Sequence, residues 1–102
     1  MNALEKKYLG KHLLVGLTYL NEDESFDEKM QIHGTIIKVS KNTIVLEQAD
    51  NSEEFSIPFD EDNLEKGQPE AIYELKSTGE AVEKVDFISS WTIHSPDEND
   101  NL

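Results

Sequence analysis

Carboxylates are the most abundant side chains in this sequence that could do chemistry, with 22 Asp and Glu in 102 residues. They are densest in two runs, residues 22–24 and residues 60–62. The second run resembles the start of a calcium-binding loop, but the EF-hand pattern needs an oxygen ligand at its fifth position and Gly at its sixth. Leu64 and Glu65 stand there, and the first run has no Gly either. Both runs therefore indicate solvated acidic loops, and we expect no metal and no cofactor.

Histidine and serine are the other candidates for catalysis. His12, His33 and His94 fall in separate predicted strands, so nothing local brings them together. Ser89 and Ser90 lie near His94 in sequence, but no nucleophile-elbow glycines surround them. A carboxylate pair for glycoside hydrolysis is conceivable in so acidic a chain, yet a domain of this size offers little cleft to bury one member. The sequence also has no phosphate-binding loop or dinucleotide fingerprint. We expect a protein that is not an enzyme.

Charge limits the classes of partner. The formal net charge is -13, and all nine basic residues are Lys. Arg supplies the rigid fork that reads phosphates and base edges, and none is present. The field of such a chain repels nucleic acid and anionic lipid, and it attracts basic proteins. Residues 1–19 are the exception, because they hold three Lys against one Glu. The charge therefore favours a protein partner over nucleic acid, and we expect no membrane partner.

The cellular compartment is predicted from features that the sequence lacks. Without Cys there is no disulfide framework and no Cys-based zinc site. The N-terminus has no long apolar stretch of the signal-peptide kind, and no apolar run reaches the length that spans a bilayer. These features predict a cytoplasmic protein, and the usage of Lys, Asn, Glu and Ile is typical of a bacterial chain.

A short helix is predicted at the N-terminus. Asn2 can cap it, and Glu5 stands three residues on, at the capping-box position. The helix would cover Ala3 to Leu9 and end at Gly10, since Gly readily adopts the conformation that terminates helices.

Strands are predicted for most of the remaining chain. His12 to Leu20 is apolar on both alternating faces, which predicts a strand covered on both sides. The next strand, Lys29 to Ser40, contains Gly34, and beyond it Ile37 and Val39 are apolar on the opposite parity, as a bulge would cause. Further strands are predicted at Thr43–Ala49, Glu53–Phe59 and Ala71–Leu75, with one strand or a pair at Val82–His94. An acidic linker covers Asp60 to Pro69.

The predicted fold class is mostly β. Short strands at such regular spacing favour a small barrel. We expect the short helix to precede a strongly bent, antiparallel barrel of five to seven strands. Residues 1–94 would form this single domain, and residues 95–102 a disordered acidic tail.

The segment from Leu9 to Pro58 resembles the Sm-like and SH3-like small barrels, in which a short helix precedes five bent strands. The resemblance rests on an apolar strand at Leu13–Leu20, a strand with a bending glycine at His33–Val39, and a third strand at Asn42–Glu47. It implies the barrel fold only. The RNA-binding loops of Sm-like proteins carry Asn, Arg or Lys with a stacking aromatic, and residues 73–94 show no matching signature.

A non-catalytic acidic module that binds a protein partner is the function these observations favour. One concrete form is an immunity or inhibitor protein that blocks a basic toxin, such as a nuclease, by charge complementarity. Trp91, between Ser90 and Thr92, could close one end of the barrel or serve as an exposed anchor. The candidate partner-binding residues are Glu22, Asp23, Glu24, Asp60, Glu61, Asp62 and Trp91.

The alternative is an Sm-like oligomer that binds nucleic acid through lysines gathered on one rim. The first candidates for that rim are Lys6, Lys7, Lys11 and Lys41.

Overall fold

A computed structural model gives the fold. It describes residues 2–21, 23, 26–68, 70–75 and 78–94, apart from the side chains of residues 26–28 and 94. Within these residues there are one helix and eight strands. They are α1 (Ala3–Tyr8), β1 (His12–Leu20), β2 (Phe26–Val39), β3 (Thr43–Gln48), β4 (Glu54–Pro58), β5 (Glu65–Lys66), β6 (Ile72–Glu74), β7 (Ala81–Glu83) and β8 (Phe87–His94). No helix among them has the length and apolar character needed to cross a membrane.

Helix α1 has the predicted capping box. The Asn2 side chain accepts the Glu5 N–H at 2.8 Å, and the Glu5 carboxylate accepts the Asn2 N–H at 3.2 Å. Gly10 follows the helix with φ of 78°, a conformation that Gly adopts without steric cost. Tyr8, at the end of the helix, is buried and packs against Phe59 and Phe87, with ring centroids 5.5 and 5.1 Å away. The helix thus anchors the N-terminus to the core.

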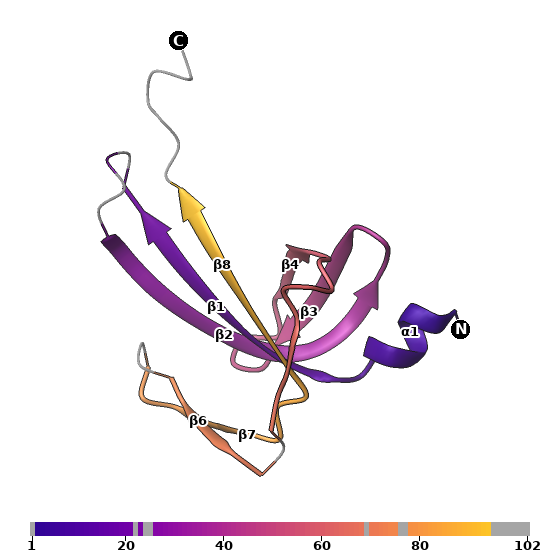
Figure 1. Cartoon of the computed structure of the whole chain (residues 1–102). Coiled ribbons are helices and arrows are strands. Elements are labelled where there is room, and N and C mark those ends of the chain that lie inside the picture. Colours follow the sequence, from indigo (N-terminus) through magenta and orange to yellow (C-terminus); the bar gives the residue numbers. More distant parts are fainter. Residues whose placement is uncertain (1, 22, 24–25, 69, 76–77, 95–102) are drawn as a thin grey trace.

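The main sheet has the strand order β4-β3-β2-β1-β8-β5 and curls into a half-barrel (Figure 1). The predicted mostly β fold with one short helix is confirmed. The expected antiparallel barrel is not, because the sheet forms only a half-barrel and β1 pairs with β8 in parallel. The chain leaves β1 through β2, builds β3 to β7, and then returns beside β1 in the same direction, with Phe87 opposite Leu13. A β-hairpin connects two strands that are adjacent in the sequence, so hairpin patterns do not predict the pairing of β1 with β8.

Strand β2 bends where the sequence predicted an irregularity. The register with β3 shifts between Ile36 and Lys38, which leaves Ile37 as the extra residue of a bulge. The predicted bulge is therefore confirmed, three residues after Gly34. Gly34 has a different role, because a Cβ there would clash with the backbone carbonyl of Glu47 on β3. Only Gly allows the two strands to pair so closely at that point.

Strand β1 is covered on both faces, as predicted. Leu13, Val15 and Leu17 face the main core, which α1 and the curled strands also line. Leu14 faces a second cluster, whose other buried members are Leu75, Val82 and Val85. These three come from the segment of the β6–β7 hairpin, which pairs as a separate two-stranded sheet. The hairpin is therefore the cover over the second face.

Two further departures concern the C-terminal half. The predicted linker from Asp60 to Pro69 contains β5, which the pattern missed because both its residues are polar and exposed. The segment from Val82 to His94 holds two strands, β7 and β8, separated by Lys84 with φ of 57°. The predicted tail, residues 95–102, lies outside the described residues.

Candidate functional site

Residues 60–62, called the acidic turn below, form a compact loop between β4 and β5. The Asp60 carboxylate accepts the Asp62 N–H at 3.0 Å, and the Asp60 carbonyl accepts the Asn63 N–H at 3.0 Å. All three acidic residues, Asp60, Glu61 and Asp62, are exposed. The turn therefore satisfies its backbone locally and presents its carboxylates to solvent, as an Asx turn does.

Asn63 attaches the acidic turn to β8. Its Oδ1 accepts hydrogen bonds from the Ser89 hydroxyl at 2.8 Å and from the Ser90 N–H at 3.1 Å. Its Nδ2 donates to the Ser90 carbonyl at 2.9 Å. Ser89 is 1% exposed, so Asn63 also satisfies a buried hydroxyl. Sequence reasoning missed this role because the two partners are 27 residues apart and no local pattern signals the contact.

Trp91 follows Ser90 in β8 and lies opposite Leu17 of β1. It is partly buried against the main core, as are Tyr19 and Ile93 on the same face of the sheet. The indole N–H is buried without a hydrogen-bond partner among the described residues, so packing holds the ring. The sequence left open whether Trp91 is a core residue or an exposed anchor. In the structure the side chain packs against the main core but remains partly exposed.

Met30 completes an apolar surface on this face. It pairs with Leu17 from the β2 side and is 40% exposed, one of two large hydrophobic residues that reach this exposure in the described chain. We refer to Tyr19, Met30, Trp91 and Ile93 as the apolar platform. Large apolar and aromatic side chains that remain partly exposed side by side are typical of contact surfaces.

The other predicted acidic cluster lies at the connection between β1 and β2. Asp23 is exposed there, whereas Glu22 and Glu24 lie outside the described residues. Leu20, at the end of β1, pairs with His94, four residues beyond Ser90 along β8. At about 3.3 Å per strand residue this separation is about 13 Å. The apolar platform therefore lies between the acidic turn and the connection that carries Asp23.

The structure brings together two histidines that the sequence placed apart. His12 Nε2 and His33 Nδ1 are 2.9 Å apart, and His33 Nε2 is 2.9 Å from a carboxylate oxygen of Glu80. The His12 N–H also donates to the Asp86 carboxylate at 2.9 Å. In the part of the chain that the structure describes, no three potential ligands gather into a metal site. The contacts of His33 with His12 and with Glu80 instead link Glu80, which immediately precedes β7, to the main sheet.

The sequence missed this pair because it depends on the β1–β2 register. His33 stands opposite Leu14, so it is diagonal to His12 across the ladder. A predicted register for this hairpin would have shown the two histidines as neighbours.

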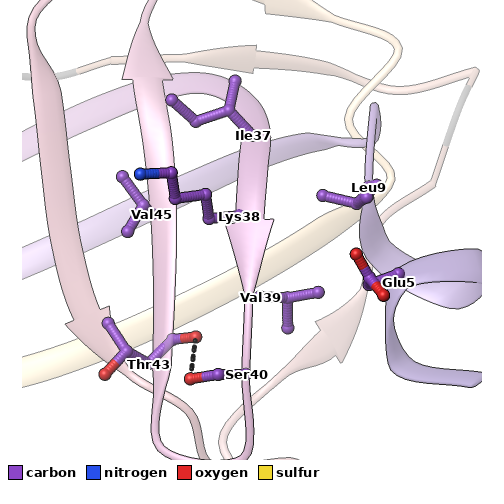
Figure 2. A pocket seen from close by; sticks show the side chains of 8 residues that line it. All are labelled: Glu5, Leu9, Ile37, Lys38, Val39, Ser40, Thr43 and Val45. Atoms are coloured by element: carbon purple, nitrogen blue, oxygen red, sulfur yellow. Dashed lines mark hydrogen bonds between the residues drawn. The ribbon is translucent and has the colours of Figure 1, made fainter. Parts of the chain in front are cut away.

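A cavity of about 320 Å³ lies between α1 and the β2–β3 hairpin (Figure 2). Leu9, Val39 and Val45 contribute apolar surface, while Glu5 and Lys38 bring one charge of each sign. Figure 2 shows Leu9 and Glu5 on the helix side, facing Val39. The remaining lining residues are Ile37, Ser40 and Thr43. This lining could hold a small amphipathic group, but the residues predicted as a site lie elsewhere.

The acidic turn and the apolar platform are the arrangement that matches the predicted site most closely. They combine exposed carboxylates with partly exposed apolar side chains beside one stretch of β8. Comparison of the chain with models of protein families, with curated proteins and with solved structures gave no match.

Proposed function

We propose that this chain is a non-catalytic acidic module that binds a basic protein partner. An immunity or inhibitor protein acting on a basic toxin or nuclease is one such module. The observation that carries the proposal is the contact of Asn63 with Ser89 and Ser90, which holds the acidic turn beside the apolar platform. The proposed contact surface thus has an apolar part and a charged part in a fixed relation.

Interface energetics support this reading. Binding energy is usually concentrated in aromatic and other large side chains that become fully desolvated, while charges around them exclude wrong partners. Tyr19, Met30 and Trp91 are of the first kind, and Asp60, with its two acidic neighbours, is of the second. The net charge of -13 would also speed the approach of a basic partner.

The nucleic-acid alternative receives less support from the positions of the lysines. Lys7 Nζ lies 5.3 Å from the centroid of the Tyr8 ring, within reach of a cation–π contact. Glu5, on the same short helix as Lys6 and Lys7, lines the cavity that Lys38 also lines. An acidic side chain therefore accompanies the basic ones near α1, which lowers the positive potential that a phosphate backbone would need.

The test is a capture experiment with two matched variants of the full chain. Asp60→Asn, Glu61→Gln and Asp62→Asn together neutralise the acidic turn, and the amide oxygen introduced at position 60 can still accept the hydrogen bond from the N–H of residue 62. The control, Asp50→Asn, Glu53→Gln and Glu54→Gln, removes the same charge from exposed positions around the β3–β4 connection. Each immobilised protein is exposed to a lysate of its source cells at about 50 mM and about 500 mM salt, and retained proteins are identified by mass spectrometry.

The proposal expects a basic protein to be retained at low salt by the native chain and by the control, and to be lost from the acidic-turn variant. High salt should release it, since screening weakens exposed charge pairs. Retention of no basic protein by the native chain would contradict the proposal. Equal loss from both variants would also contradict it, because net charge alone would then explain the binding.

A further inference from the structure

The outer edge of β8 is covered over only part of its length. Strand β5 pairs with β8 at Phe87 and Ile88. Next, the Asn63 amide bonds both the N–H and the carbonyl of Ser90, so it takes the place of a neighbouring strand there. Beyond Ser90, no strand in the described part of the chain pairs with β8 on this side. In Figure 1 the C-terminal half of β8 extends away from the β4–β5 connection, next to β1.

Thr92 provides the open hydrogen-bonding positions on this edge. Backbone groups of successive strand residues point to opposite sides, so Thr92 directs its N–H and carbonyl the same way as Ser90, away from β1. Its neighbours Trp91 and Ile93 have side chains on the face of the apolar platform. An open edge beside apolar side chains is the arrangement to which another strand adds.

We propose that this edge receives an extended, basic segment of the partner as an added strand, paired with Thr92. The inference rests on the proposed function and specifies its partner as a strand-forming one. The open edge covers Trp91 to His94, about 13 Å at about 3.3 Å per strand residue, which accommodates about four residues of an added strand. The segment would lay alternate apolar side chains on the apolar platform.

Charge determines the chemistry of the occupant. The acidic turn flanks the edge near Ser90, and the connection that carries Asp23 follows β1, whose last residue pairs with His94. A segment rich in Lys or Arg complements both ends. A second copy of this chain would instead bring a net charge of -13 against an equal charge. A basic partner strand is therefore favoured over self-association.

The experiment combines a backbone variant with a defined probe. Thr92→Pro removes the outward N–H while the bonds between β1 and β8 are kept, because that N–H points away from β1. Thr92→Val is the control, since it retains the N–H and favours a strand. The probe is a synthetic octapeptide of alternating Lys and Val, and a second form, methylated at every backbone amide, keeps the charge but cannot donate to a sheet. Binding is followed by the fluorescence of Trp91, the one Trp in the chain.

The native chain and Thr92→Val should bind the unmethylated peptide. Binding should weaken by about ten-fold or more for Thr92→Pro, and likewise for the methylated peptide, because backbone hydrogen bonds are lost. Should Thr92→Pro fail to fold, hydrogen exchange of the Thr92 amide in the native chain tests whether the peptide pairs with this edge. The Thr92 amide should then exchange about ten-fold more slowly with the peptide bound.

Equal binding of both peptides, with no protection of the Thr92 amide, would overturn the added strand while leaving charge-led binding of a basic protein intact. Failure of the native chain to bind either peptide would also overturn it, and the capture experiment would then decide the proposed function separately. Peptide-independent dimers that disappear in Thr92→Pro would assign the edge to a second copy and overturn the inference as well.

Discussion

The side-chain amide of Asn63 pairs with the backbone of Ser90 much as a strand residue would, accepting its N–H at 3.1 Å and donating to its carbonyl at 2.9 Å. Through this contact the Asn63 side chain occupies the edge of β8 at Ser90 and positions the acidic turn. The loop conformation and the proposed contact surface therefore depend on the same residue.

Replacing Asn63 should cost stability. Asn63→Ala leaves the buried Ser89 hydroxyl and the Ser90 backbone without their partners, and an unsatisfied buried group costs about 1–3 kcal/mol. Urea unfolding of the variant and the native chain measures the change. Asn42→Ala is the control, since Asn42 is exposed in the turn after β2, and it should change the free energy of unfolding by less than about 0.5 kcal/mol. Equal effects of the two variants would show that the Asn63 contact does not stabilise the fold.

Gly34 should tolerate no side chain. In Gly34→Ala the new methyl group would clash with the Glu47 backbone, so β2 and β3 must separate at a cost of about 1–3 kcal/mol or more. Gly16→Ala is the matched control on β1, because its Cβ would meet only the Ser90 hydroxyl at 3.8 Å. Thermal unfolding should show a large drop in Tm for Gly34→Ala and a small change for Gly16→Ala. Similar Tm values for the two would refute the close approach of β2 and β3.

His33 and Glu80 should be energetically coupled. A double-mutant cycle of His33→Ala and Glu80→Ala is expected to give a coupling of about 0.5 kcal/mol, because Glu80 is half exposed and solvent screens the pair. The same cycle with Glu83→Ala, an exposed acid of β7, should give no coupling. Urea unfolding provides both values. If the two cycles agree, the contact between His33 and Glu80 does not hold the β6–β7 hairpin.

Met30 should contribute to partner binding but little to stability. Met30→Ser removes an exposed part of the apolar platform, and loss of a side chain that contributes about 1 kcal/mol lowers affinity about five-fold. Ile72→Ser is the control, since Ile72 is 64% exposed on β6, in the separate two-stranded sheet. The readout is retention of the captured basic protein. Unchanged retention by Met30→Ser, or an equal fall in retention by both variants, would show that the apolar platform does not contribute to partner binding.

Local signals predicted the parts of this fold that depend on neighbouring residues. The capping box of Asn2 and Glu5 gave the helix, and the switch in apolar parity after Gly34 gave the bulge. The parallel pairing of β1 with β8 could not be predicted in this way, because it joins segments separated by most of the chain. The same limit applies to β5, whose two polar residues form a strand only because β8 lies beside them.

The same distinction between local and long-range features applies to the candidate site. Composition identified Asp60 and its acidic neighbours, and residue type identified Trp91, but nothing in the sequence placed the acidic turn beside the strand that carries Trp91. The contact that does so, from Asn63 to Ser90, arises from tertiary structure. The pairing of His12 with His33 likewise requires the register of β1 and β2.

The most direct test of the central claim is the ratio of the captured basic protein retained by the acidic-turn variant to that retained by the control variant around the β3–β4 connection. Both carry the same net charge, so the ratio reports the position of the acids and not their number. We expect a ratio below about one tenth at about 50 mM salt, because the acidic turn is held beside the apolar platform. A ratio near one would contradict it.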